Sequence, residues 1–448
     1  MADQLTSTIP SLSRRAQAET SPRLTALLWE VLSDQWHPQD NPSGYVSIGV
    51  AENRLMHSEL HAYIDRTFKA HDCFLTYGDG PKGSHRLRRA LAQFLTKHLR
   101  SVIPLEPEHV VVTNGVTSAI EHASWAFANP GDAFLLGQPY YGAFPNDICM
   151  RPNVKLIEVR FGHELDPMSK DAVRNYEQAI LDAKTQGVAV KGLMLCNPHN
   201  PLGRCYSQEV LVEYLKLCQK HKIHLVSDEI YALSVWQNNE DSSPPQLPFT
   251  SILSLDLTNL INPALVHCIW GISKDFGANG LRLACLVSQS NPAFHEALTS
   301  VALLSSASSM ADHTVANLLE DAEFTDQYIQ ENAKRLSTAY SQVVAFLRKH
   351  KIKYTPGSNA GFFLWVDLGE AYLRKHPERR GKCDLTREVM NALLEQKLYL
   401  ASGEMFGSET PGQFRIVFSH PSEYVDEALE RMVKAIEVGY QGKMKAKL

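Results

Sequence analysis

The chain has 448 residues, of which 44% are hydrophobic and 21% are charged, and its formal net charge at pH 7 is -5. This length and composition are typical of a globular protein with about two or three domains and a large apolar core. Nucleic-acid binding depends on clustered cations, so the slightly acidic balance argues against a nucleic-acid-binding protein.

Composition also bears on the cellular compartment. The eight cysteines include no Cys-x-x-Cys pair and no zinc-ligand spacing, which predicts reduced thiols and no metal site. No stretch approaches 18 apolar residues and the N-terminus has no basic segment before an apolar one, so we expect a cytoplasmic protein without a membrane partner. The last residues, Ala446-Lys447-Leu448, resemble the Ser-Lys-Leu peroxisomal signal. Peroxisomal import therefore stays open beside a chance polar terminus.

The chain up to residue 320 is predicted to form an arm followed by an α/β domain. Residues 1–45 are polar and broken by prolines, with one amphipathic piece at 24–32. From 46 to 320, apolar runs alternate with helical periods such as 117–127, which predicts a three-layer domain around a mainly parallel sheet. The segment up to about residue 60 is expected to contribute to a smaller domain. The expected strands are 109–113, 133–136, 154–159, 192–196, 223–227, 265–269 and 283–287.

The pattern changes after about residue 292, where long helical stretches begin. Two long helices are expected at 295–319 and 326–350. Residues 321–448 are predicted to form a smaller α+β domain, which a long helix joins to the large one. Its expected strands and helices are 361–367, 385–396, 413–418 and 422–438.

One lysine lies in a loop of small residues, eight positions before an arginine, in the run Ser273-Lys274-Asp275-Phe276-Gly277-Ala278-Asn279-Gly280-Leu281-Arg282. The amine of Lys274 is suited to form a Schiff base with the aldehyde of pyridoxal 5'-phosphate (PLP). A downstream guanidinium such as that of Arg282 is suited to grip the phosphate with two hydrogen bonds. This spacing alone only suggests a PLP site.

Two further motifs precede this run, Asn197-Pro198-His199-Asn200-Pro201-Leu202-Gly203 and Ser227-Asp228-Glu229-Ile230-Tyr231. At these residues the chain resembles the fold-type I PLP enzymes of the class I/II aminotransferase family, and within it the branch of 1-aminocyclopropane-1-carboxylate (ACC) synthase. The resemblance extends from about Gly49 to Phe418. It implies a PLP-transferase large domain with a mainly parallel sheet, a smaller α+β domain, and a homodimer with shared active sites.

Several residues are expected around the cofactor ring. Asp228 is expected to pair with the pyridine nitrogen and keep it protonated, which makes the ring an electron sink. Tyr231 and Asn200 are expected to contact the phenolic oxygen, although Asn200 also suits an Asx turn and Asp228 a helix N-cap. Family comparison assigns the ring that stacks on the cofactor to Tyr141, with Tyr140 as the alternative.

The phosphate is expected at the N-terminus of the helix that follows the strand at 109–113. Val116 and Thr117 open this helix, where amides and hydroxyls bind anions, although Thr117 also suits a plain N-cap. Ser273 is expected to add a hydroxyl. The family often has a second serine two positions earlier, but this chain has Gly271 there. One phosphate hydrogen bond is therefore expected to be missing.

Three more residues are assigned through the resemblance. The family uses an arginine at the position of Arg415 to bind the α-carboxylate of the amino-acid substrate, and an edge-strand salt bridge is the alternative. Glu52 resembles the ACC synthase glutamate at the substrate pocket, although a glutamate before a helix also complements the helix dipole. Tyr77 resembles the tyrosine that reaches the cofactor phosphate of the partner subunit.

These residues specify chemistry at Cα of an α-amino acid and leave its outcome open. The ACC synthase-like features favour a substrate with a leaving group, hence a lyase or transferase of specialised metabolism that cleaves a carbon-sulfur bond. However, Leu75-Thr76 replaces the Gln-Asp of the ACC synthase pattern, and Gly142-Ala143 replaces its Pro-Gly. An aminotransferase is therefore the alternative. A non-catalytic homologue is a minor alternative, against which the joint presence of the cofactor and substrate residues argues.

Overall fold

The computed structural model describes residues 12–13, 16–17 and 24–442. Most of the predicted arm and the tripeptide Ala446-Lys447-Leu448 lie outside the described residues. The amphipathic piece of the arm lies in helix α2 (Leu24–Ser33). Within the described ranges, no helix combines the length and the apolar character that crossing a membrane requires.

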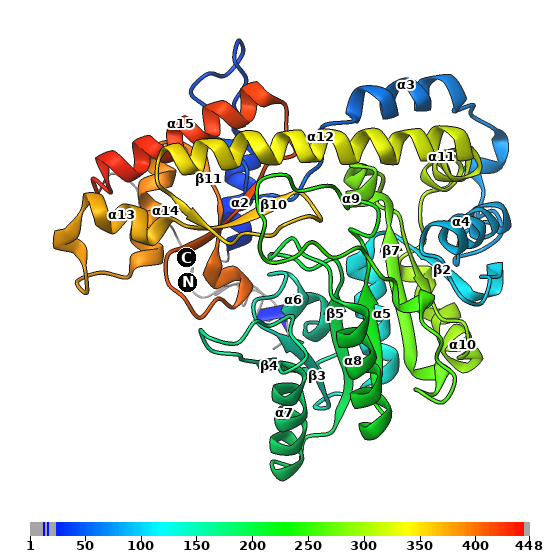
Figure 1. Cartoon of the computed structure of the whole chain (residues 1–448). Helices are drawn as coiled ribbons and strands as arrows, with labels where there is room; N and C mark the ends of the chain where they lie inside the picture. Colours follow the sequence, from blue (N-terminus) through cyan, green and yellow to red (C-terminus); the bar gives the residue numbers. More distant parts are fainter. Residues whose placement is uncertain (1–11, 14–15, 18–23, 443–448) are drawn as a thin grey trace, which may run out of the picture.

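A seven-stranded sheet forms the centre of the larger part of the molecule (Figure 1). The strand order is β2-β8-β7-β6-β5-β3-β4, in which β8 is antiparallel to both neighbours and the other pairs are parallel. All seven predicted strands are confirmed. Most are buried on both faces, which explains why they appear as continuous apolar runs. The strands are β2 (Val110–Thr113), β3 (Ala133–Gly137), β4 (Lys155–Val159), β5 (Val190–Cys196), β6 (His224–Asp228), β7 (Val266–Gly271) and β8 (Ala284–Val287).

Helices cover both faces of this sheet and complete a three-layer α/β fold (Figure 1). Local capping sets their ends. At the start of α8, the hydroxyl of Ser207 accepts a hydrogen bond from the amide of Val210 at 3.3 Å, and the left-handed Lys222 (φ 53°) ends the helix. The helices are α4 (His85–His98), α5 (Val116–Phe127), α6 (Phe144–Cys149), α7 (Val173–Thr185), α8 (Gln208–His221), α10 (Pro292–Val301) and α11 (Ser309–Glu320).

The single helix predicted at 295–319 is wrong. The chain forms α10, which ends at Val301, then a short 3-10 turn at Ala302–Leu304, and α11, which begins at Ser309. Four serines lie between the apolar periods of the two helices. Serine side chains compete for backbone hydrogen bonds, and Ser308 caps α11 by accepting from the amide of Met310 at 3.3 Å.

The second part of the molecule contains an antiparallel sheet of order β12-β13-β10-β9. The long helix α12 (Ala322–Lys349) runs from this part to α11 (Figure 1). Strand β1 (Val46–Ser47) pairs in parallel with β11 (Leu398–Tyr399), so the segment after the arm joins the C-terminal part. The domain boundary at residue 321 stays a prediction. The other elements are β9 (Lys353–Tyr354), β10 (Phe363–Asp367), α13 (Leu368–Lys375), α14 (Leu385–Glu395), β12 (Ala401–Ser402), β13 (Gln413–Val417) and α15 (Ser422–Val438).

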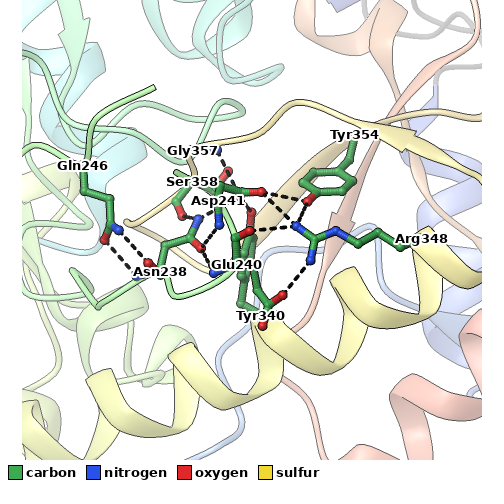
Figure 2. Close-up of polar contacts among 9 residues, drawn as sticks. All are labelled: Asn238, Glu240, Asp241, Gln246, Tyr340, Arg348, Tyr354, Gly357 and Ser358. Carbon is green, nitrogen blue, oxygen red and sulfur yellow. Dashed lines mark hydrogen bonds and ion pairs between the residues drawn. The ribbon is translucent and has the colours of Figure 1, made fainter. Parts of the chain in front are cut away.

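A buried carboxylate links a loop of the larger part to α12 and β9 (Figure 2). Asp241 accepts hydrogen bonds from the hydroxyl of Tyr340 at 2.5 Å, the hydroxyl of Tyr354 at 2.8 Å and the amide group of Asn238 at 2.8 Å. Burial alone would raise the pKa of Asp241, but these hydrogen bonds outweigh burial and hold that pKa below its usual range. The charged carboxylate therefore fastens the two parts together.

Candidate active site

A cavity of about 620 Å³, including the space at its mouth, lies beyond the carboxyl ends of β5, β6 and β7. This is the position where parallel α/β sheets bind ligands. The structure brings nine of the predicted site residues together there: Val116, Thr117, Tyr141, Asn200, Asp228, Tyr231, Ser273, Lys274 and Arg282. The wall is completed by Ile120, Asp147, Cys196, Ile230 and Asn279.

Lys274 lies in the short helix α9 (Ile272–Asp275), directly after β7. Its Nζ donates a hydrogen bond to the carbonyl oxygen of Ala51 at 2.6 Å. Burial, helped by the positive charge of Arg415 and opposed by Glu52, lowers the pKa of Lys274 to about 8. At neutral pH part of this amine is therefore uncharged, as covalent attachment to an aldehyde and proton transfer both require.

Asp228 is the last residue of β6 and is 3% exposed. Its Oδ1 accepts a hydrogen bond from the amide of Ile230 at 3.2 Å, and burial raises its pKa to about 7. No ion pair involves this carboxyl within the part of the chain that the structure describes. A buried carboxyl in this state is suited to a ligand that brings a protonated nitrogen. The N-cap alternative does not hold, because the chain does not enter a helix directly after Asp228.

Val116 and Thr117 at the start of α5, together with the guanidinium of Arg282, form a site suited to an anion, which we call the anion cradle. Gly115, the N-cap, has φ 115°, and a Cβ at this position would lie 2.4 Å from Nη2 of Arg282. Glycine therefore allows both this backbone angle and the close approach of the guanidinium to the free amides of the helix N-terminus. Thr117 is the second residue of α5, so its N-cap alternative is wrong. At Gly271 a Cβ would lie 2.8 Å from the Cβ of Ala284, so the site leaves little room for the second serine of the family.

Arg415 is a buried guanidinium on β13 and is 3% exposed. Its Nη1 donates to Oδ1 of Asn200 at 2.9 Å, and its Nη2 donates to the carbonyl oxygen of Gly49 at 2.6 Å. The rings of Phe406 and Phe363 lie 4.8 Å and 5.4 Å from its Cζ, and its Nε has no partner among the described residues. The edge-strand alternative is wrong, because β13 lies between β12 and β10. Burial lowers the pKa of Arg415.

Comparison with known proteins identifies the family of this chain. The family model described as "Aminotransferase class I and II" matches residues 46–432. The chain belongs to the class I and II aminotransferases. Within this family it lies in the ACC synthase-like branch. It is 34% identical over 413 residues to "1-aminocyclopropane-1-carboxylate synthase-like protein 1" of Bos taurus, covering 90% of this chain and 78% of that protein. A Mus musculus relative, 33% identical over 408 residues (89% of this chain, 67% of that protein), is named "Probable inactive 1-aminocyclopropane-1-carboxylate synthase-like protein 2".

The fold of this aminotransferase-family chain agrees with solved structures. An aspartate aminotransferase from Thermus thermophilus with maleate has a TM-score of 0.72 at 20% identity, covering 95% of this chain and 99% of that one. The family depends on PLP. The cavity fits this cofactor, because its wall offers an amine, a buried carboxyl and a cradle for an anion. Together these groups match the aldehyde, the ring nitrogen and the phosphate of PLP.

The two neighbouring tyrosines have different environments. Tyr141 lines the cavity, and its ring meets that of Phe144 edge-on at 5.3 Å between centroids. Tyr140 points elsewhere, because its hydroxyl donates to Glu158 and its side chain is buried outside the cavity wall. The geometry therefore favours Tyr141 over Tyr140 as the residue beside the cofactor ring.

The remaining predicted residues differ in their relation to the cavity. Glu52 lies close to it, since its Oε1 accepts a hydrogen bond from Nδ2 of the wall residue Asn279 at 2.9 Å. The same carboxylate acts on the pKa of Lys274. Tyr77 is fully exposed, at 101%, and does not line the cavity of its own chain.

Two polar wall residues have no counterpart among the predictions. Asn279 lies within the lysine-to-arginine run, and its carbonyl oxygen accepts from Nη1 of Arg282 at 2.9 Å. Its position inside the run that carries Lys274 and Arg282 could have identified Asn279 as a site residue from the sequence. Asp147 lies in α6, six positions after Tyr141, and belongs to no recognised motif. Only the packing of α6 against α5 brings it to the cavity.

Proposed function

We propose that this protein is a PLP-dependent enzyme that acts at Cα of an α-amino acid, as an ACC synthase-like lyase or transferase of specialised metabolism. The observation that carries the proposal is the buried guanidinium of Arg415, which has no carboxylate partner among the described residues. A buried, unpaired guanidinium is suited to a planar anion such as an α-carboxylate. Its charge acts on the pKa of Lys274, so the carboxylate site and the amine lie near each other.

We propose a separate role for each of the residues around the reacting carbon. Arg415 binds the α-carboxylate and Asn200 fixes the orientation of its guanidinium. Lys274, in its uncharged form, accepts the proton from Cα and returns it. PLP, when bound, supplies an electron sink for the charge left at Cα. Asp228 holds a proton on the ring nitrogen, and Tyr231 lines the same cavity.

The phosphate is held by a separate group of residues. Val116 and Thr117 offer the N-terminus of α5, and Arg282 offers a positive charge next to Gly115. Ser273 adds a hydroxyl on the cavity wall. These contacts fix the cofactor at one end, so that the amine of Lys274 and the carboxylate site keep a constant relation to it.

The position of Glu52 favours elimination or displacement, with a carbon-sulfur bond as the bond that breaks. Its carboxylate is held by Asn279 at the edge of the cavity and acts on the pKa of Lys274. An anion there complements a positively polarised leaving group such as a sulfonium. The alternative is an aminotransferase that exchanges an amino group between an α-amino acid and a 2-oxo acid, which the family description favours. A non-catalytic homologue is the minor alternative, suggested by the name of the mouse relative.

The number of turnovers without an acceptor separates the first two reactions. An amino acid with sulfur or a sulfonium at Cβ or Cγ is incubated with the PLP-loaded enzyme, with and without a 2-oxo acid. We expect many turnovers without the 2-oxo acid, because elimination leaves no amino group on the enzyme. Turnover that stops after one equivalent and resumes on addition of a 2-oxo acid would identify an aminotransferase. Lys274→Ala serves as the inactive control.

We also propose a homodimer with shared active sites. Tyr77 and Leu75 are fully or largely exposed, at 101% and 81%, and Leu303 and Leu304 add exposed apolar side chains at 69% and 67%. Apolar side chains that gather in one exposed patch are typical of association surfaces. In the dimer, Tyr77 of each chain would complete the cofactor site of the partner, where its hydroxyl is suited to bind phosphate.

A further inference from the structure

Asp147 is a buried carboxyl on the wall of the PLP cavity that has no part in the roles above. It is 9% exposed and shares the cavity with Asp228. Its Oδ2 lies 3.4 Å from Oγ1 of Thr117, at the N-terminus of α5. No cation pairs with Asp147 in the ranges that the structure describes. The cavity therefore presents two carboxyls, one of which stands beside the anion cradle.

The surroundings of Asp147 disfavour two ionised carboxyls. Burial raises the pKa of Asp147 to about 7 and that of Asp228 to about 7, and the charge of Asp147 adds to the shift at Asp228. The two groups therefore resist ionising together. The other titratable groups on the wall are Tyr141, Cys196, Tyr231, Lys274 and Arg282. Outside the wall, α5 and β4 pack against α6. On α5, Glu121 pairs with His122 and Arg151. On β4, Lys155 is exposed, and Glu158 accepts hydrogen bonds from Tyr140 and Gln138.

The protonation state of Asp147 decides whether the Thr117 hydroxyl can donate a hydrogen bond to a phosphate. Because Asp228 must be ionised to hold a proton on the ring nitrogen, the remaining proton belongs on Asp147. A protonated Asp147 donates to Oγ1 of Thr117, and the hydroxyl hydrogen of Thr117 stays free for an anion. An ionised Asp147 takes that hydrogen, turns a lone pair toward the anion and adds a second negative charge beside it.

We propose that Asp147 is a positioning residue of the cofactor site, which in its protonated form orients the Thr117 hydroxyl toward the phosphate and on ionisation weakens cofactor binding. The inference rests on the binding of PLP and not on the proposed reaction. Its failure would leave the lyase and aminotransferase alternatives untouched, and a wrong reaction would leave it untouched. The test therefore measures binding and not turnover.

The test uses the cofactor-free protein and 4'-deoxypyridoxine 5'-phosphate, which has no aldehyde and cannot react with Lys274. Its dissociation constant is measured by calorimetry between pH 6.5 and pH 9 for the wild type, Asp147→Asn and Asp312→Asn. Asp312 is a matched control, because it is also 9% exposed with a pKa raised by burial, but lies outside the cavity. We expect the ratio of wild-type to Asp147→Asn dissociation constants to rise above about pH 7, approaching about tenfold per pH unit. The ratio of wild type to Asp312→Asn should stay constant.

A ratio for Asp147→Asn that is equally flat would overturn the proposal. Thr117→Val gives a second measurement that does not require Asp147 to be changed. Loss of its hydroxyl should weaken binding more at pH 6.5 than at pH 8.5, because only the protonated Asp147 frees that hydrogen for the phosphate. An equal loss at both pH values would contradict the proposed orientation. Pyridoxine without a phosphate should show no such pH effect, and the same effect with it would also contradict a role at the phosphate.

Discussion

Arg415 and Asn200 form one hydrogen-bonded unit, with Nη1 of the arginine 2.9 Å from Oδ1 of the asparagine. The two residues lie 215 positions apart, on β13 and on the turn after β5. Since Asn200 lines the PLP cavity and Arg415 is the proposed carboxylate site, this hydrogen bond fixes the substrate site relative to the cofactor site. Loss of either partner should therefore affect the orientation of the bound amino acid.

Replacing Arg415 should weaken amino-acid binding far more than PLP binding. Arg415→Ala removes the only buried cation proposed for the α-carboxylate, and the loss should be about 2–5 kcal/mol in substrate binding. Arg415→Lys should recover little, because a lysine cannot form the two parallel hydrogen bonds. The measurement is KM for the active amino acid together with Kd for PLP. Arg431→Ala is a control, since Arg431 bonds to backbone carbonyls outside the cavity. An unchanged KM in Arg415→Ala would remove Arg415 from the site.

Lys274→Ala should abolish covalent attachment of PLP while the protein still folds, because the side chain faces the cavity. Reduction with borohydride followed by intact mass measurement checks this directly. The wild type should gain the mass of one reduced cofactor per chain, and the variant should gain none. The exposed Lys97 is a candidate for nonspecific labelling, so Lys97→Ala, which removes an ion pair with Asp326, serves as the control. An adduct that persists in Lys274→Ala would assign the attachment to another lysine.

Shared sites predict complementation between two variants that are each impaired. A dimer of Tyr77→Phe and Lys274→Ala chains contains one site with an intact lysine from one chain and an intact tyrosine from the other. After the subunits are mixed and refolded, each heterodimer should therefore have up to about half of the activity of a wild-type dimer. Its intact site should bind the cofactor with the affinity of the wild type. Mixtures that stay at the level of the parent variants would mean that each site is built within one chain.

His420 should make the free energy of unfolding fall as the pH becomes acidic. Both its ring nitrogens are buried without a partner among the described residues, and burial lowers its pKa to about 3. The unfolded chain, with a histidine pKa near 6.5, binds the proton more tightly, so this contribution is complete above about pH 6.5 and is lost as pH falls toward 3. At pH 5 the loss is about 2 kcal/mol.

Urea unfolding of His420→Leu at pH 7.5 and pH 5 measures this contribution. The difference in the free energy of unfolding between the two pH values should be smaller in the variant than in the wild type by about 2 kcal/mol. His61→Gln, at a side chain that is 79% exposed, is the control and should leave the difference unchanged. An undiminished difference in His420→Leu would show that another group takes up the proton.

The sequence predicted much of the sheet and most of the cofactor cavity for a common physical reason. Strands buried on both faces, such as β5 and β6, must be continuously apolar, and the polar residues that follow them, such as Asn200 and Asp228, then mark the ligand edge. The helix break at Ser305–Ser308 was missed because the apolar period resumes on its far side, whereas serine capping acts locally.

Other features depend on tertiary packing that a periodic pattern does not encode. The position of β13 inside its sheet, which rules out an edge-strand role for Arg415, follows from strand order and not from the sequence of the strand. Asp147 reaches the cavity only because α6 packs on α5. Tyr77 lies outside the cavity of its own chain, so its predicted role still requires a second chain.

Exchange of the Cα proton with solvent tests the central claim most directly, because lyase and aminotransferase both require removal of this proton by Lys274. The PLP-loaded protein is incubated in D₂O with sulfur-containing and ordinary α-amino acids, and deuterium at Cα is followed by proton NMR. We expect exchange in at least one amino acid with the wild type, none with Lys274→Ala, and strong reduction with Arg415→Ala. Absence of exchange across the panel in a fully PLP-loaded wild type would contradict the account and favour a non-catalytic homologue.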